Sequence, residues 1–312
     1  GTPSVTIEHT TVEVIAEVST VSNVEVPLTG GTLPLLTEGD EYLLMAVAQH
    51  HQGNTGGENV HGADIAVAQA SGVPFSNMRD DIEPPACAVA SDQGQWFTGL
   101  NQIQYSVATH GQITLEHSAG AGQTHYVNNA ILMAFNLTDF GTENVDWFAS
   151  VTAPFVTVTD AGWSNLTPSI TVGDGVSDWL IFGSFQSDQP QAGGQIQYGL
   201  FDGSVNSDFA MHQFADVADI KSIFFSAVFT GIASTTFQTA ARAVAASGNT
   251  ARIFTSGIYA LRLNRFAQYS IQSASGPTSP PSAAEFSLLT DSVVASSNSD
   301  WGILAFVRNQ WV

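Results

Sequence analysis

The feature that most constrains the fold is an internal repeat of strand-like segments. At an offset of 137 residues, Asp40–Gln49 (DEYLLMAVAQ) aligns with Ser177–Gln186 (SDWLIFGSFQ). At an offset of 126 residues, Ile131–Leu137 (ILMAFNL) aligns with Gly257–Leu263 (GIYALRL). Self-similarity at a fixed spacing is the signature of a repeated structural unit. The sequence therefore predicts two copies of one unit, and Ser299–Val312 (SDWGILAFVRNQWV) resembles the opening segment of a third.

The segments show the two-residue periodicity of β-strands. VTIEHTTVEVIAEV, NQIQYSV and GQIQYGLF alternate apolar with polar or small residues, and Gly, Asn and Asp mark turns at short intervals. Thr236–Ala243 (TFQTAARA) has residues of high helical propensity, but it aligns with the alternating segment His110–His117, so we predict a strand there as well. The pattern predicts an all-β fold of two tandem jelly-roll or β-sandwich units with an extra C-terminal strand.

The repeat and the position of turn-forming residues divide the chain into five parts. These are an N-terminal strand or arm (1–24), a first unit (25–150), a second unit (151–272), a Pro- and Ser-rich linker (273–285) and a C-terminal strand (286–312). The change of offset implies that the first unit has about 11 additional residues. We expect them as an insertion at Phe75–Val89 (FSNMRDDIEPPACAV), which is rich in turn formers.

The composition is poor in charge and strongly acidic. Only 11% of the residues are charged and the net charge is −21, whereas about 25% are charged in an average domain. This excludes nucleic acid as an expected partner, since phosphate binding needs many Lys or Arg. Residues 1–220 contain a single cation, Arg79, and residues 221–312 are mildly basic. One interpretation is that this difference is random variation in the charge of a weakly charged surface. The other is that the acidic part of one chain contacts the basic part of another copy, head to tail.

Histidines and acidic segments are the candidate metal ligands. His50, His51, His61 and Asp64 surround a Gly-Gly turn, but the second unit has Asp188, Tyr198 and Phe201 at the positions aligned with the last three. We therefore expect polar surface there more often than a metal site. Three acidic turns are separate candidates for binding calcium through their carboxylates and carbonyls: TEGDE (37–41), RDDIE (79–83) and GDGVSD (173–178). Their spacing does not match an EF-hand, so we expect no cofactor.

No segment predicts catalysis or membrane insertion. The chain lacks GxSxG, HExxH, P-loop and dinucleotide-binding motifs, and we expect it not to be an enzyme. No apolar run approaches the roughly 20 residues that span a bilayer. Cys87 is the single cysteine, so an intrachain disulfide is excluded. Two glycosylation sequons begin at Asn136 and Asn165, and both are weak because one lies in a predicted strand and the other precedes Pro168.

The C-terminal segment is too apolar to be expected alone in solvent. An unpaired strand of this kind promotes aggregation, so it is expected to pair with a sheet. Two arrangements satisfy this: the strand completes a sheet of its own molecule, or it is donated to a neighbouring subunit. The residues expected to make this contact are Trp301, Ile303, Leu304, Phe306, Val307 and Trp311.

The repeated segments also resemble a known class of module. DEYLLMAVAQ with GQTHYVNNAILMAFNL, and SDWLIFGSFQ with GNTARIFTSGIYALRL, are similar to the repeated jelly-roll modules of phage virion and appendage proteins, particularly those of marine phage. The resemblance is at the level of strand patterns and supplies no active site. It implies a structural or attachment role. The tandem β units, the surface poor in charge, the charge asymmetry and the C-terminal strand lead us to expect a structural subunit of a virion or extracellular assembly, whose partners are copies of itself and other virion or surface proteins. The alternative is a carbohydrate-binding or adhesion β-sandwich, with exposed Trp or Tyr side chains stacking on glycans.

Overall fold

The fold was analysed in a computed structural model. It describes residues 7–53, 63–70, 72–81, 95–120, 122–153, 155–159, 162–188, 195–203, 206–213, 220–244, 250–266 and 269. Nearly all regular structure in these residues is antiparallel β-sheet, which confirms the predicted fold class.

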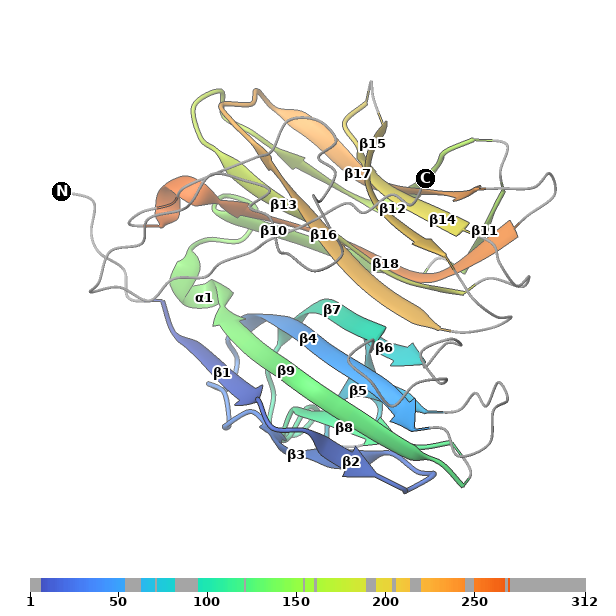
Figure 1. The fold of residues 1–312 in the computed structure, drawn as a ribbon. Coiled ribbons are helices and arrows are strands. Elements are labelled where there is room, and N and C mark those ends of the chain that lie inside the picture. The colour runs from blue at the N-terminus through green and yellow to red at the C-terminus, as the bar shows by residue number, and fades with distance from the viewer. Residues whose placement is uncertain are drawn as a thin grey trace, which may run out of the picture.

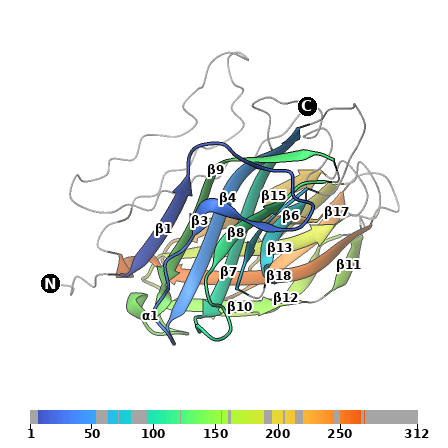
Figure 2. The same ribbon diagram turned by 90° about the horizontal axis from the view of Figure 1, so that it is seen from below.

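The first unit is a jelly roll of two antiparallel sheets. Its strands are β1 (His9–Val14), β2 (Val18–Thr20), β3 (Val26–Thr32), β4 (Glu41–Gly53), β5 (Asp64–Ala68), β6 (Pro74–Asp81), β7 (Gln95–Gln104), β8 (Thr114–Ser118) and β9 (Thr124–Asn136). One sheet has the order β1-β9-β4-β7, with β2 also paired to β9, and the other has the order β3-β8-β5-β6. The view from below shows β1, β9, β4 and β7 side by side (Figure 2). Strands that alternate between two facing sheets in this order form a jelly roll.

The second unit repeats this topology strand for strand. After the short helix α1 (Leu137–Phe140), its strands are β10 (Trp147–Thr152), β11 (Val156–Thr159), β12 (Ser164–Val172), β13 (Trp179–Asp188), β14 (Gln195–Phe201), β15 (Asn206–Gln213), β16 (Lys221–Phe229), β17 (Thr235–Val244) and β18 (Thr250–Arg262), followed by the 3₁₀ turn η1 (Leu263–Arg265). The sheet orders are β10-β18-β13-β16, with β11 beside β18, and β12-β17-β14-β15. The predicted duplication is thus visible in the topology, and the predicted strand at Thr236–Ala243 is confirmed as part of β17.

Each jelly roll encloses an apolar core between its two sheets. In β4, alternate side chains such as Tyr42, Leu44 and Ala46 are fully buried in the first core. The intervening Leu43 belongs to a separate apolar cluster between the two jelly rolls. Strands that are buried on both faces have nearly continuous apolar sequences, which explains the run YLLMAVA.

The two jelly rolls pack against each other through what we call the seam cluster. The sheet that contains β16 and β18 lies against β6 and β7 of the first jelly roll, and α1 lies beside β4 (Figure 1). The side chains of the cluster come from both jelly rolls and are all buried: Leu43, Leu100, Leu137, Phe140, Trp147, Phe182, Phe224, Tyr259 and Leu261. Burial of this apolar surface stabilises the contact between the two jelly rolls.

Three details differ from the sequence-based division. Strands β1 and β2 of the predicted N-terminal arm pair with β9, so they are part of the first jelly roll. Residues 147–150, assigned to the first unit, belong to β10, which pairs with β18 of the second. The predicted insertion at Phe75–Val89 is wrong in its first half, because Pro74–Asp81 forms β6, the topological equivalent of β15. The rest of that segment lies outside the described residues.

The alignment of Asp64 with Phe201 is also wrong. Asp64 pairs with Ser118, and Gln195 pairs with Val244, whose position matches that of Ser118 in the repeat. Asp64 is therefore equivalent to Gln195. The extra residues of the first unit are divided between the segment from β4 to β5 and the segment from β5 to β7, because both are longer than in the second unit. Periodicity alone could not locate them, since turns of different length leave the strand pattern unchanged.

Among the described residues, no helix has the length and apolar character needed to span a bilayer.

Candidate functional site

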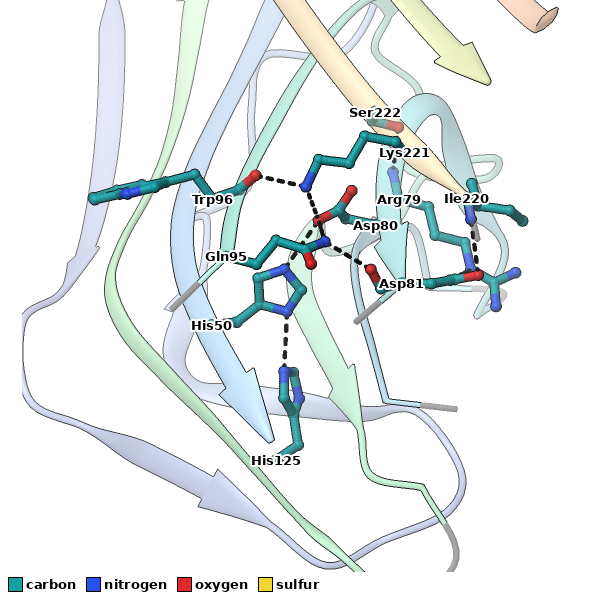
Figure 3. A network of polar contacts seen from close by, with 10 residues as sticks. All are labelled: His50, Arg79, Asp80, Asp81, Gln95, Trp96, His125, Ile220, Lys221 and Ser222. Atoms are coloured by element: carbon teal, nitrogen blue, oxygen red, sulfur yellow. Dashed lines mark hydrogen bonds and ion pairs between the residues drawn. The ribbon is translucent and has the colours of Figure 1, made fainter. Parts of the chain in front are cut away.

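A buried polar network joins the two jelly rolls at the end of the seam (Figure 3). The side chain of Lys221, on β16 of the second jelly roll, reaches Asp80 on β6 of the first. The Nζ–Oδ2 distance is 2.8 Å, and the same Nζ donates to the backbone oxygen of Trp96 at 2.9 Å. Asp80 is fully buried and Lys221 is 4% exposed. A buried charge is tolerated only when it is paired and hydrogen-bonded, and both partners satisfy that condition here.

Asp80 Oδ2 is the centre of the network. It accepts hydrogen bonds from Lys221 Nζ, from Gln95 Nε2 at 2.7 Å and from His50 Nε2 at 3.0 Å. The three donors come from β16, β7 and β4, so that oxygen ties together strands of both jelly rolls. Hydrogen bonds to a carboxylate are among the strong ones in proteins, and a buried network of them fixes one arrangement of the strands.

A row of histidines continues the network into the first jelly roll. His50 Nδ1 lies 3.1 Å from His125 Nε2, and the rings of His125 and His117 are 5.4 Å apart. The carboxylate of Asp80 can only accept, so His50 Nε2 carries a proton and, with neutral rings, His125 Nε2 donates to His50 Nδ1. Burial lowers the pKa of His117 to about 4 and that of His125 well below its ordinary value, so both rings are neutral at neutral pH. A proton on a neighbouring histidine would repel a proton on His125, and this repulsion lowers the pKa of His125 further.

A second pair of contacts links β6 to the start of β16. The Asp81 backbone N–H donates to the Ile220 oxygen at 2.9 Å, and the Ile220 N–H donates to Asp81 Oδ2 at 3.2 Å. Arg79 donates to Asp64 Oδ2 at 2.8 Å, and its backbone N–H donates to Ser222 Oγ at 3.0 Å. Burial, together with the hydrogen bond to Asp64 and its charge, raises the pKa of Asp81 to about 9, so this carboxyl is protonated at neutral pH.

The second jelly roll also covers the outer edge of β7. The Leu100 oxygen accepts from Ser184 Oγ at 3.1 Å and from Tyr259 Oη at 3.5 Å, while Lys221 binds the Trp96 oxygen. Sheet edges with free backbone groups promote unwanted pairing. In this protein, side chains of β13, β16 and β18 donate hydrogen bonds to backbone oxygens at this edge of β7, so the second jelly roll covers the edge.

The structure separates the four residues expected around a metal. His50 is in the buried network, whereas His51 stacks on Tyr126 with ring centroids 4.8 Å apart. Asp64 binds Arg79, and His61 lies outside the described residues. Throughout the described part of the chain, no group of three or more His, Cys, Asp or Glu side chains has a geometry suited to a metal ion.

The expected calcium turns have other roles in the structure. Arg79, Asp80 and Asp81 belong to strand β6, so RDDIE does not begin as a turn. Asp174 accepts hydrogen bonds from the Val176 and Ser177 backbone and from the Ser177 hydroxyl. These bonds lower the pKa of Asp174 to about 2 and leave it as the internal acceptor of its turn.

The cations of the second jelly roll are used within the molecule. Lys221 pairs with Asp80, Arg252 with Asp188, and Arg265 lies 3.8 Å from Asp146. Arg262 pairs with Asp174 at 2.6 Å and lies 3.7 Å from Asp146, and Arg242 donates to Gln197 and lies over the Trp163 ring. The described cations of the second jelly roll therefore contact groups of the same molecule, while most of the acidic excess of the chain has no cation to pair with.

The aromatic residues and sequons divide by burial. Trp179 is buried at the start of β13, and Trp147 is buried in the seam. Trp96 is 50% exposed. Asn136 is fully buried and Asn165 is exposed. The six expected assembly residues, Trp301, Ile303, Leu304, Phe306, Val307 and Trp311, lie outside the described residues.

Sequence reasoning missed Lys221 and Asp80 as partners. From the sequence, Lys221 was one of the positive charges in residues 221–312, and Asp80 was part of an expected acidic turn. One signal was present: Lys221 is the single lysine of the chain, and it begins the apolar run KSIFFSAVF. Its partner is 141 residues away along the chain, a separation that no short motif encodes.

Comparisons with known proteins give weak similarity of fold. No protein-family model matches the chain, and neither does any curated protein. Among solved structures, the chain is similar to the infectious bursal disease virus VP2 subviral particle at 9% identity, covering 82% of this chain and 72% of that one with a TM-score of 0.28. It is similar to the CBM22-1-CBM22-2 tandem domain of Paenibacillus barcinonensis Xyn10C at 11% identity, covering 83% and 92% with a TM-score of 0.20.

A third similarity, to dimeric latent PorU from Porphyromonas gingivalis, has 7% identity and a TM-score of 0.26. It covers 72% of this chain, which spans only 24% of the PorU chain. Viral capsid proteins and carbohydrate-binding modules are thus among the weakly similar structures. At these values no functional residue is carried over from any of them.

Proposed function

We propose that the protein is a non-enzymatic structural subunit of a virion or extracellular assembly, which associates with copies of itself through its β-sheets. The observation that carries this proposal is the way the two jelly rolls are joined. The seam cluster, the closed edge of β7 and the Lys221–Asp80 network hold four sheets in one body. A rigid body of this kind is suited to a subunit that packs between neighbouring subunits in an assembly.

The proposal requires a surface for self-association, and sheet edges are the natural one. Strands β1 and β3 end their sheets on the side of the first jelly roll opposite β7 and β6, and β10 and β12 do so in the second. Strand addition to such an edge supplies backbone hydrogen bonds between subunits. The apolar residues 299–312 are the proposed added strand, paired either with the same molecule or with a neighbour.

Particle sizing of two chains tests this proposal. The full chain is expected to form assemblies whose size rises with concentration, measured by light scattering after size exclusion and by electron microscopy. A chain that ends at residue 285 is expected to stay folded and monomeric if the strand is donated to a neighbour. A full chain that remains monomeric at every concentration contradicts the proposal. Unfolding of the truncated chain shows instead that the strand completes its own molecule.

Glycan binding is the second candidate, and the exposed Trp96 favours it. Half of the Trp96 side chain is open to solvent, and an exposed indole ring can stack on a sugar. A glycan array tests this, with the Trp96→Ala variant as the comparison. Binding that Trp96→Ala removes, in a chain that stays monomeric, would replace the structural proposal with an adhesion function.

A further inference from the structure

The single lysine of this protein is in its interior. Lys221 is the only lysine in 312 residues, and it is 4% exposed, with Nζ 2.8 Å from Asp80 Oδ2. Lysine is almost never buried to this extent without a partner. The surface of the described residues is therefore built without lysine, while the one lysine present lies beside a fully buried carboxyl group.

The pair can become neutral without its partners moving apart. Asp80 has no exposed surface, and its contacts include His50, which is also fully buried. Moving an ammonium and a carboxylate out of water is unfavourable for each ion. Transfer of one proton from Lys221 Nζ to Asp80 removes both charges without separating the partners. The result is an amine held next to a carboxylic acid.

Two further donors are directed at the oxygen where charge would develop. Gln95 Nε2 and His50 Nε2 donate to Asp80 Oδ2 at 2.7 and 3.0 Å (Figure 3). Donors arranged in this way around an acyl oxygen stabilise the tetrahedral intermediate of acyl transfer. Because these donors are held by β7 and β4, they are in place before any reaction begins.

We propose that Lys221 and Asp80 condense to an isopeptide bond that joins the two jelly rolls covalently. The Nζ lone pair attacks Cγ of the protonated Asp80, and the Gln95 and His50 N–H groups stabilise the negative charge on Oδ2. A proton passes from Nζ to the Oδ1 hydroxyl, which leaves as water as the C=O bond at Oδ2 reforms. One C–N bond forms and one C–O bond breaks, and nothing is oxidised or reduced.

The geometry supplies the driving force that free amines and acids lack. In water such a pair ionises and does not condense. Here the amine and the carboxyl group are held in contact at 2.8 Å, and fixed positions give effective concentrations of about 10⁵–10⁸ M in well-oriented intramolecular reactions. The bond would link β6 to β16, across 141 residues of chain. It would prevent the jelly rolls from separating even when the seam cluster opens.

The intact mass of the denatured full chain tests the proposal directly. The expected mass is that of the sequence less one water molecule. Trypsin has no site between Arg79 and Lys221, so a digest is expected to yield the single peptide 80–242, uncleaved after Lys221 and lighter than its sequence by one water molecule, whereas a free Lys221 gives separate peptides 80–221 and 222–242. Since the chain has one lysine, amine labelling of the denatured protein is expected only at the terminal amine. A mass equal to the sequence, with Lys221 labelled, overturns the proposal whether or not any variant folds.

Matched variants separate condensation from an ordinary ion pair. Lys221→Arg keeps the positive charge but has no primary amine, so its mass is expected to equal that of its own sequence. Asp80→Asn condenses with loss of ammonia in place of water, so its product is expected to have the same mass as the condensed wild-type chain. A water loss that persists in Lys221→Arg would place the modification elsewhere and contradict the assignment.

Discussion

At the scale of the residue, Asn136 shows how a single side chain closes the first jelly roll. It ends β9, its Nδ2 donates to Asp40 Oδ2 at 2.9 Å and to Tyr42 Oη at 3.3 Å, and its Oδ1 caps α1 by accepting from the Asp139 N–H. We expect Asn136→Ala to lower the free energy of unfolding by about 2 kcal/mol, because it removes a helix cap and leaves buried partners unsatisfied.

Urea denaturation followed by tryptophan fluorescence measures this change. Asn165→Ala is the matched control, since Asn165 also begins an Asn-Leu-Thr sequence but is exposed on β12. It is expected to change the free energy of unfolding by less than about 0.5 kcal/mol. Equal effects of the two substitutions would contradict the role given to Asn136.

The buried histidines make a residue-scale prediction about acid. The pKa of His117 is about 4 in the fold against an ordinary 6.5, so the unfolded chain binds a proton that the folded chain rejects. This contribution to stability is complete above pH 6.5 and is lost as the pH falls toward 4. The urea midpoint is therefore expected to fall over that range.

The His117→Gln variant isolates this effect from other titrating groups. Asp81, whose pKa is raised to about 9, contributes in the opposite direction, because its folded form binds a proton that the unfolded chain releases. Paired carboxylates such as Asp174 contribute in the same direction as His117 at lower pH. His117→Gln is expected to flatten the slope of stability between pH 6.5 and 4; an unchanged slope would show that His117 does not titrate differently in the two states.

At the scale of the element, the connection between β12 and β13 depends on Gly173. Its φ is +112°, and a Cβ there would lie 2.2 Å from the Ala233 oxygen. We expect Gly173→Ala to destabilise the protein by more than about 2 kcal/mol, because backbone strain and a clash with rigid backbone add together. Gly203 has φ +94° but no atom within 4 Å of the added Cβ, so Gly203→Ala is expected to cost only about 1 kcal/mol. Thermal unfolding compares the two, and similar losses would show that the Ala233 contact has no effect.

At the scale of the whole molecule, neighbouring phenylalanines on β16 separate the seam from the core. Phe224 belongs to the seam cluster, and Phe225 belongs to the core of the second jelly roll. We expect the wild-type protein to unfold in one calorimetric transition. Phe224→Ala, which removes about 3–5 kcal/mol of packing, is expected to split it into two, because each jelly roll retains its own core.

Phe225→Ala is the control for this experiment. It is expected to lower the stability of the second jelly roll while the seam stays packed, so a single broadened or shifted transition should remain. Two transitions in Phe225→Ala and one in Phe224→Ala would contradict the assignment of the two side chains.

Much of the fold was predictable because it follows from local pattern. The alternation of apolar residues identified strands, and the repeat showed that β17 is a strand although TAARAVAAS has helical propensity. The position of the predicted insertion was less accurate, because Pro74–Asp81 contains turn-forming residues but pairs with β5. Tertiary pairing overrode the local signal there.

The candidate site could not be predicted in the same way. His50, Asp80, Gln95 and Lys221 lie on four strands, and the strand order of each sheet and the packing of one jelly roll on the other bring them together. Apolar periodicity and turn residues act over short distances, so they were enough to predict an all-β chain with a duplicated unit. The burial of the single lysine of one unit against a carboxyl group of the other became visible in the folded molecule alone, because that contact depends on how two complete sandwiches pack.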